Sequence, residues 1–247
     1  MKHEDPAEVA PDVFLVRGRD VNWVILRDGG ELTLIDAGYP GDADAVESSV
    51  RQLGHRPEDV RAILVTHAHA DHVGAVNPFH DRFGTPVLLD PVEVRHARRD
   101  YLEQVGPGQI AANIWRPGVL SWTVRIIRNG ALRDVTAPHA EAFELGGPLD
   151  LPGRPTPVPT HGHTSGHCAF ALPEVGAVVV GDELITGHAL SRQEGPQLLP
   201  PMFHHGSGDV AKALDTLATL DADLVLPGHG PAHHGRIADA VTVARDR

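Results

Sequence analysis

The stretch Ala62-Ile-Leu-Val-Thr-His-Ala-His-Ala-Asp-His-Val-Gly74 decides how this chain folds. It opens with four apolar residues, a run typical of a strand that is covered on both faces. Four metal-binding side chains follow within six residues: His67, His69, Asp71 and His72. The first two are two residues apart and point to the same side of an extended chain, so they can bind one ion. The other two lie where the backbone turns and can face a second ion. We therefore predict a metal site at the end of this strand, because zinc accepts both imidazole nitrogen and carboxylate oxygen.

The order His-x-His-x-Asp-His after an apolar strand resembles the signature of the metallo-β-lactamase superfamily. This resemblance implies an α+β fold in the form of a four-layer αββα sandwich. Two mixed sheets would face each other, with outer helices and with metal ions at the sheet edge. We expect residues 1–247 to form one such domain, with a possible substrate-covering insertion at about 91–124, where prolines and glycines interrupt the helical pattern.

Three further segments resemble the remaining ligand loops of the family, and each follows an apolar strand. In Thr160-His-Gly-His-Thr-Ser-Gly-His167 the histidine before the second threonine, His163, matches a family ligand. His161 stands where the family usually has proline, so we read it and His167 as outer-sphere or rim residues.

The last two ligands come from the second half of the chain. Asp182 matches the carboxylate that bridges two ions in the family, whereas the neighbouring Glu183 points the opposite way on an extended chain. His229, in Pro-Gly-His-Gly, matches the final ligand. Asp36 matches a family aspartate that supports the metal loop by hydrogen bonds, although an ordinary turn residue is an equally good interpretation.

The resemblance therefore implies two divalent cations, with zinc expected and iron or manganese possible. The implied ligands are His67, His69 and His163 for one ion, Asp71, His72 and His229 for the other, and Asp182 shared between them. Two cations sharing a water would provide hydroxide at neutral pH. The predicted activity is hydrolysis of a small ester, lactone or thioester, with Asp71 and Asp182 in catalytic roles.

Composition limits the partners. The chain has 33 acidic residues against 21 Lys and Arg, a net charge of −12, which disfavours phosphate backbones and hence a nuclease. Cys168 is the only cysteine, so no intrachain disulfide can form, and we expect it to be a buried strand residue. The charged start lacks the apolar segment of a secretory signal, and no apolar run approaches the ~20 residues of a membrane span. We expect a cytoplasmic protein that acts on a small molecule, with no membrane partner.

The sequence motifs do not single out one branch of the superfamily. True β-lactamases of the family lack the bridging aspartate that Asp182 supplies, and glyoxalase II-like enzymes carry a further C-terminal helical region, while little sequence follows His229. A lactonase or a thioesterase fits equally well. The alternatives are an iron-dependent persulfide dioxygenase of the same fold, a nuclease, or a metal-binding module without activity.

Local patterns predict the remaining elements. Strands are expected at 13–16, 22–27, 31–35, 85–89, 141–145, 149–151, 155–159, 168–172, 177–180 and 223–226, and helices at 42–53, 75–83, 209–220 and 237–243. Four side chains are candidates for contacts with substrate: Trp115, His188, Arg192 and His204.

Overall fold

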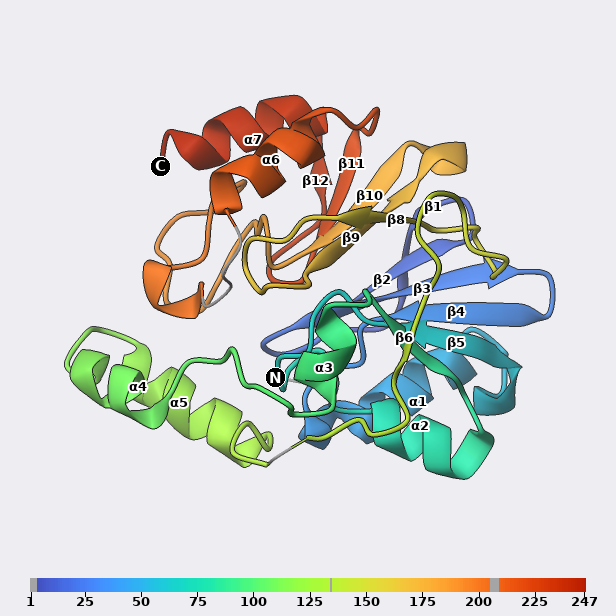
Figure 1. Cartoon of the computed structure of the whole chain (residues 1–247), viewed down its shortest axis with the longest axis horizontal. Coiled ribbons are helices and arrows are strands. Elements are labelled where there is room, and N and C mark those ends of the chain that lie inside the picture. The colour runs from blue at the N-terminus through green and yellow to red at the C-terminus, as the bar shows by residue number, and fades with distance from the viewer. Residues whose placement is uncertain (1–3, 134, 205–208) are drawn as a thin grey trace.

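The computed structural model describes residues 4–133, 135–204 and 209–247. Two β-sheets pack face to face, and helices cover the outer face of each (Figure 1). This arrangement confirms the predicted four-layer α+β sandwich with two mixed sheets.

The first sheet has seven strands in sequence order. Its first four strands pair antiparallel, and β4, β5, β6 and β7 pair parallel. The strands are β1 (Ala7–Ala10), β2 (Val13–Arg17), β3 (Asn22–Asp28), β4 (Glu31–Ile35), β5 (Val60–Leu64), β6 (Val87–Leu89) and β7 (Glu141–Ala142). Because β4 and β5 run parallel, the residues that follow them emerge at the same edge of the sheet.

The second sheet has the order β12-β11-β10-β9-β8. Its strands are β8 (Thr156–Pro159), β9 (Cys168–Leu172), β10 (Ala177–Gly181), β11 (Leu224–Pro227) and β12 (His233–His234). Strands β10 and β11 pair parallel, so Asp182 and the 228–230 loop leave the sheet at the same end.

Apolar side chains form a separate core between each pair of layers. Between the sheets, Leu26 and Leu64 of the first sheet belong to one buried cluster with Phe170 and Leu226 of the second. Burying such a side chain contributes about 1.5–3 kcal/mol relative to leaving it exposed. Cys168 belongs to the same cluster, as expected.

The outer helices each bury one apolar face. Helices α1 (Ala43–Gln52) and α2 (Val76–Phe83) cover the first sheet, and α6 (Val210–Ala218) and α7 (Ile237–Arg245) cover the second (Figure 1). Asp209 caps α6, because its side chain accepts hydrogen bonds from the amides of Ala211 and Lys212. Short 3₁₀ turns lie at Pro40–Asp42, Pro57–Asp59, Pro173–Val175 and Pro201–Phe203.

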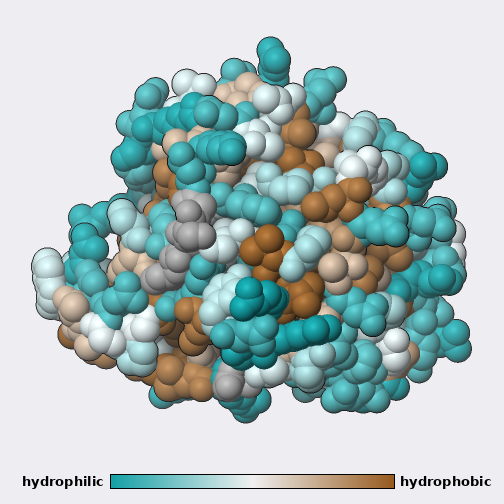
Figure 2. Space-filling model, viewed as in Figure 1, coloured by the Kyte–Doolittle hydropathy of each residue, from teal (hydrophilic) through white to brown (hydrophobic). Residues whose placement is uncertain are grey.

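The segment predicted as an insertion contains three helices: α3 (Glu93–Ala97), α4 (Pro107–Asn113) and α5 (Val119–Arg128). Helix α5 buries Trp122 and Ile126 and exposes Leu120 on its other side. Figure 2 shows apolar surface at the lower left, over α4 and α5. In the described ranges, no helix is both long and apolar enough to cross a membrane.

Some predicted elements differ from the structure. Residues 149–151 form no strand, and of 141–145 only Glu141–Ala142 pairs with a neighbour. The short edge strands β1 and β12 were not predicted. The Gly-, Pro- and His-rich residues 185–208 are expected to form a loop, and of these 205–208 lie outside the described residues.

Candidate metal centre

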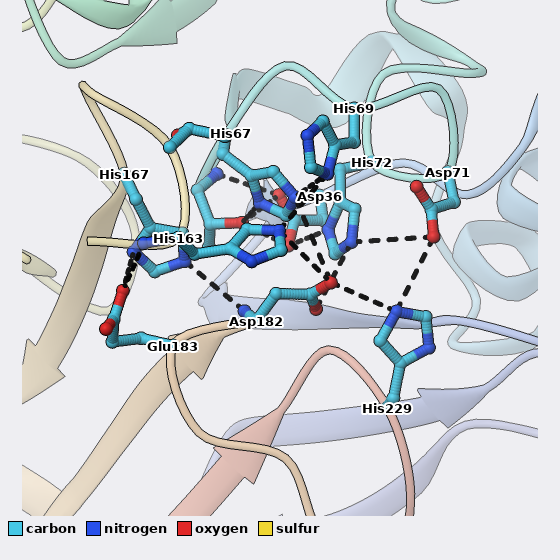
Figure 3. Close-up of polar contacts among 12 residues, drawn as sticks. Asp36, His67, His69, Asp71, His72, His163, His167, Asp182, Glu183 and His229 are labelled. Atoms are coloured by element: carbon cyan, nitrogen blue, oxygen red, sulfur yellow. Dashed lines mark hydrogen bonds and ion pairs between the residues drawn. The ribbon is translucent and has the colours of Figure 1, made fainter. Parts of the chain in front are cut away.

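Four loops, each following a strand, meet at one edge of the sandwich (Figure 3). They follow β5, β8, β10 and β11, and they carry all seven side chains predicted as ligands. The donor atoms form three groups, and within each group the atoms lie within 4.8 Å of one another. The groups are His67, His69 and His163; His67, His72 and Asp182; and Asp71, His72 and His229.

In the first group, three imidazole nitrogens converge. His69 Nδ1 lies 2.9 Å from His67 Nε2 and 3.2 Å from His163 Nε2. All three side chains are buried. Three histidine nitrogens around one point are a donor set that zinc and other borderline cations accept.

Asp182 joins the first group to the third. Its Oδ2 lies 3.7 Å from His163 Nε2 and 3.2 Å from His229 Nε2, and its Oδ1 lies 3.4 Å from His72 Nε2. His229 Nε2 in turn lies 3.5 Å from Asp71 Oδ2. The carboxylate of Asp182 therefore lies between the two sets of donors, as the bridging interpretation requires.

Each histidine of the cluster is held by its other ring nitrogen. His69 Nε2 donates to the carbonyl of Glu103 (2.5 Å), and His229 Nδ1 donates to the carbonyl of Asp20 (2.6 Å). His72 Nδ1 donates to Asp36 (2.8 Å). His67 Nδ1 contacts the Thr66 hydroxyl, and His163 Nδ1 contacts His204. Such outer contacts are typical of metal-binding histidines, because they fix the tautomer and the ring orientation.

The fixed tautomer of His229 presents its other ring nitrogen to a cation, which can be a metal ion or a proton. A nitrogen that faces a carbonyl must carry the proton, so the opposite nitrogen of a neutral His229 turns a lone pair towards Asp71 and Asp182. Without a metal, only a proton can relieve this repulsion. Burial opposes that protonation, yet the two carboxylates raise the pKa of His229 to about 10.

In the group of His67, His69 and His163, the surroundings lower the pKa values instead of raising them. Burial, together with neighbouring imidazoles, lowers the pKa of His67 and His163 well below the ordinary value. Burial lowers the pKa of His69 to about 4. These rings are therefore neutral at physiological pH, which is the state that binds a metal.

Two buried atoms in the centre form no hydrogen bond within the described part of the chain: His72 Nε2 and Asp182 Oδ1. Burying a polar atom without a partner is costly, and a cation bound between these two atoms would satisfy both. Both atoms face the cluster, so the donor set fits a cation-binding site.

We expect Gly228→Ala to abolish metal binding while leaving the sheets folded. A Cβ at this position would lie 2.3 Å from Asp182 Oδ1 and 2.9 Å from His72 Cε1, so both side chains would have to move. Metal content after dialysis measures the effect, and Gly30→Ala, where a Cβ meets no atom within 4 Å, is a control for glycine loss. A full metal content in the Gly228 variant would contradict the placement of Asp182 as a ligand.

Asp36 holds the first ligand loop, as one of its two interpretations predicted. It accepts hydrogen bonds from the Thr66 amide (2.8 Å), the Thr66 hydroxyl and His72. These contacts arise because Asp36 and Thr66 follow the parallel strands β4 and β5. Asp36 has a positive φ of 65°, which is uncommon for a residue other than glycine and is typical of functional sites.

Two further carboxylates hold the loops, and nothing in the sequence indicated them. Glu93 is fully buried and accepts hydrogen bonds from the amides of Ala68 (2.7 Å) and Gly166 (3.0 Å). The side chain of Glu103 accepts from the amide of Ser165 (2.7 Å). Both therefore link the insertion to the ligand loops.

The two outer candidates of the sequence, His161 and His167, and the neighbouring Glu183 have different surroundings. His167 Nε2 accepts from the amide of Asp182 (3.2 Å) and so positions that ligand's backbone. Glu183 points away and accepts from the amide of His163 (2.9 Å), and burial raises the pKa of Glu183 to about 8. His161 contacts Asp90 (3.2 Å).

A pocket opens beside the ligands. Its walls include Tyr39, Val105, Trp122, Ile126, His188, Leu199 and Phe203. Of the four predicted substrate contacts, only His188 lines it. Burial lowers the pKa of His188 to about 3, so this wall is uncharged.

The other three candidates lie elsewhere. Trp115 is 77% exposed and donates to the carbonyl of Ala112, so it lies outside the pocket, and Trp122 occupies the wall instead. His204 contacts His163 and thus supports a ligand. Arg192 is exposed and lines a neighbouring groove.

Comparison with known proteins agrees with this geometry. The profile of the metallo-beta-lactamase superfamily matches residues 16–229. A probable metallo-hydrolase, YflN of Bacillus subtilis, is 26% identical over 80% of this chain and 74% of its own length. A hydroxyacylglutathione hydrolase of Rhizobium meliloti is 31% identical over 70% of this chain and 51% of its own length.

Solved structures show the same fold. A metallo-beta-lactamase of Cronobacter sakazakii superposes with a TM-score of 0.69 at 18% identity, covering 99% of this chain and 93% of its own. The family match spans all seven clustered donors, from His67 to His229. This chain therefore belongs to the metallo-β-lactamase superfamily.

Proposed function

We propose that this protein is a metal-dependent hydrolase of small carbonyl substrates, namely esters, thioesters or lactones. One observation supports this above all: seven buried or partly buried donors converge beside a pocket that opens onto Asp71 and Asp182. The proposed sites are those of the family pattern. His67, His69 and His163 would hold one divalent cation, Asp71, His72 and His229 a second, and Asp182 both.

The chemistry divides between the ions and the chain. Divalent cations such as zinc supply Lewis acidity, which lowers the pKa of water towards neutrality and polarises a carbonyl. The chain holds the donors rigid through the outer contacts described above. Asp71 also lines the pocket, where its carboxylate can accept a hydrogen bond from the attacking water and orient it. The apolar wall of Trp122, Ile126 and Phe203 limits the water around the acyl group.

The donor set favours a hydrolase over the two enzymatic alternatives. An iron-dependent persulfide dioxygenase uses one iron held by two histidines and one aspartate, whereas seven donors meet here. A nuclease needs cations along its substrate path. The described residues that line the pocket beside the ligands include no Lys or Arg.

Metal removal and reloading test the proposal. Protein stripped with a chelator should lose all hydrolysis of a panel of thioesters, esters, lactones and β-lactams. Zinc or manganese should restore it, with two equivalents bound per chain by elemental analysis. One iron per chain, with oxygen uptake on a glutathione persulfide and no hydrolysis, would instead establish the dioxygenase.

A further inference from the structure

The pocket beside the metal ligands, hereafter the inner pocket, is small. The space open to water beside the ligands is about 50 Å³, and its walls are mostly apolar. Because its described lining contains no Lys or Arg, it suits a small uncharged acyl group. The rest of a substrate must therefore lie outside this pocket.

A larger groove adjoins the pocket. Its open space is about 450 Å³, and Trp122 and His188 line both the pocket and the groove. The two rings pack edge to face, with their centroids 5.8 Å apart, and form the wall that the pocket and the groove share. The groove also lies next to the ligands, because Asp20 on its wall accepts the hydrogen bond from His229. A substrate that reaches over this shared wall would enter the groove.

Three exposed arginines line the groove: Arg17, Arg19 and Arg192. The acid on its wall, Asp20, is buried against Arg125, with Nε–Oδ2 at 2.8 Å, so its charge is already paired.

Two other acids reduce this positive charge only in part. Glu194 also lines the groove, and Arg17 contacts Glu4 at 3.3 Å in an exposed pair, a type of contact that is weak in water. In a chain with a net charge of −12, the groove is a local exception that attracts anions.

Building on the proposed function, we infer that this groove binds the anionic end of the leaving group. The substrate is then an ester or thioester of a small apolar acid, whose alcohol or thiol carries a carboxylate or a phosphate. Guanidinium groups bind both anions through paired hydrogen bonds. Hydrolysis breaks the acyl–oxygen or acyl–sulfur bond. The OH of water joins the acyl carbon, and its proton joins the leaving alcohol or thiol, which remains anionic at its far end.

Three acetyl thioesters test the inference. Their thiols are N-acetylcysteamine, which is neutral, glutathione, which carries carboxylates, and coenzyme A, which carries phosphates. The zinc-loaded enzyme should prefer an anionic thiol by about tenfold or more in kcat/KM, mainly through KM, because hydrogen bonds to charged groups are the stronger kind. Which of the two anionic thiols is preferred identifies the anion. The preference should weaken with added salt.

The double variant Arg19→Gln with Arg192→Gln should lose this preference. Arg56→Gln removes an exposed guanidinium that does not line the groove and should keep the preference. Equal kcat/KM for all three thioesters in the wild type, or a preference that survives in the double variant, would overturn the inference.

A binding measurement separates this inference from the proposed function. Calorimetry with the unreactive S-methyl thioethers of glutathione and coenzyme A requires no turnover. Arginine-dependent binding without hydrolysis of any thioester would support the groove and refute the hydrolase. Hydrolysis of the neutral thioester with no arginine-dependent binding of either thioether would refute the groove and leave the hydrolase.

Discussion

Asp182→Ala should abolish turnover and remove most of the bound metal. The carboxylate lies 3.2–3.9 Å from His67, His72, His163 and His229, so its loss removes a contact to each of these four ligands. We expect kcat/KM to fall on the order of 10³-fold, the scale of losing a central electrostatic group. Metal analysis and hydrolysis of a cognate thioester measure the effect.

The loss should be chemical and not a failure to fold. Asp182 follows β10, whose five residues are buried in the sheet, and the substitution leaves their packing intact. Circular dichroism should therefore match the wild type. Asp182→Asn, which keeps the shape but removes the charge, should also fail to bind metal. Asp221→Ala, at an exposed position, is the control and should retain activity. Normal turnover in Asp182→Ala would refute the shared-ligand role.

Much of this centre was predictable because its information is local. His67 and His69 follow one strand, and Asp182 and His229 each follow another, so a strand end and a donor are adjacent in sequence. Parallel pairing of β10 with β11 then brings the last two together. The strand-then-donor pattern indicated the first loop, and the resemblance to the superfamily implied the donors of the other three.

The insertion was not predictable in the same way. Pro107 was expected to interrupt a helix, but it stands in the first turn of α4, where its missing amide costs nothing. Trp115 was a candidate pocket residue because aromatics are scarce, yet α5 turns Trp122 inward instead. Which face of a short helix is buried depends on what packs against it.

Long-range contacts explain the remaining gaps. Residues 149–151 have the composition of a strand but no partner at either sheet edge, and β12 has only two residues that pair with β11. Glu103 contacts His69 through its backbone carbonyl. Every residue has such a carbonyl, so the sequence does not indicate which one binds His69. Such contacts need the fold before they can be seen.

Glu93→Ala should destabilise the protein even without metal. The carboxylate is fully buried and accepts from the Ala68 amide and His96 Nδ1 at one oxygen, and from the Thr164 hydroxyl and the Gly166 amide at the other. Removing it leaves four buried donors without their acceptor. Loss of a buried partner of this kind costs about 3–5 kcal/mol. The midpoint of urea unfolding, measured on protein freed of metal with a chelator, should therefore move to a clearly lower urea concentration.

The same variant should also weaken metal binding, because Glu93 joins the two ligand loops. Ala68 lies between His67 and His69, and Thr164 follows His163, so one side chain sets the separation of three ligands. Removing such a support typically costs about 10–100-fold in metal affinity. Glu174→Ala, at an exposed position, should change neither property. A Glu93 variant with the urea midpoint of the wild type but with weak metal binding would show that Glu93 supports the metal site alone. A lower urea midpoint together with the metal affinity of the wild type would mean that the ligand loops keep their geometry without Glu93.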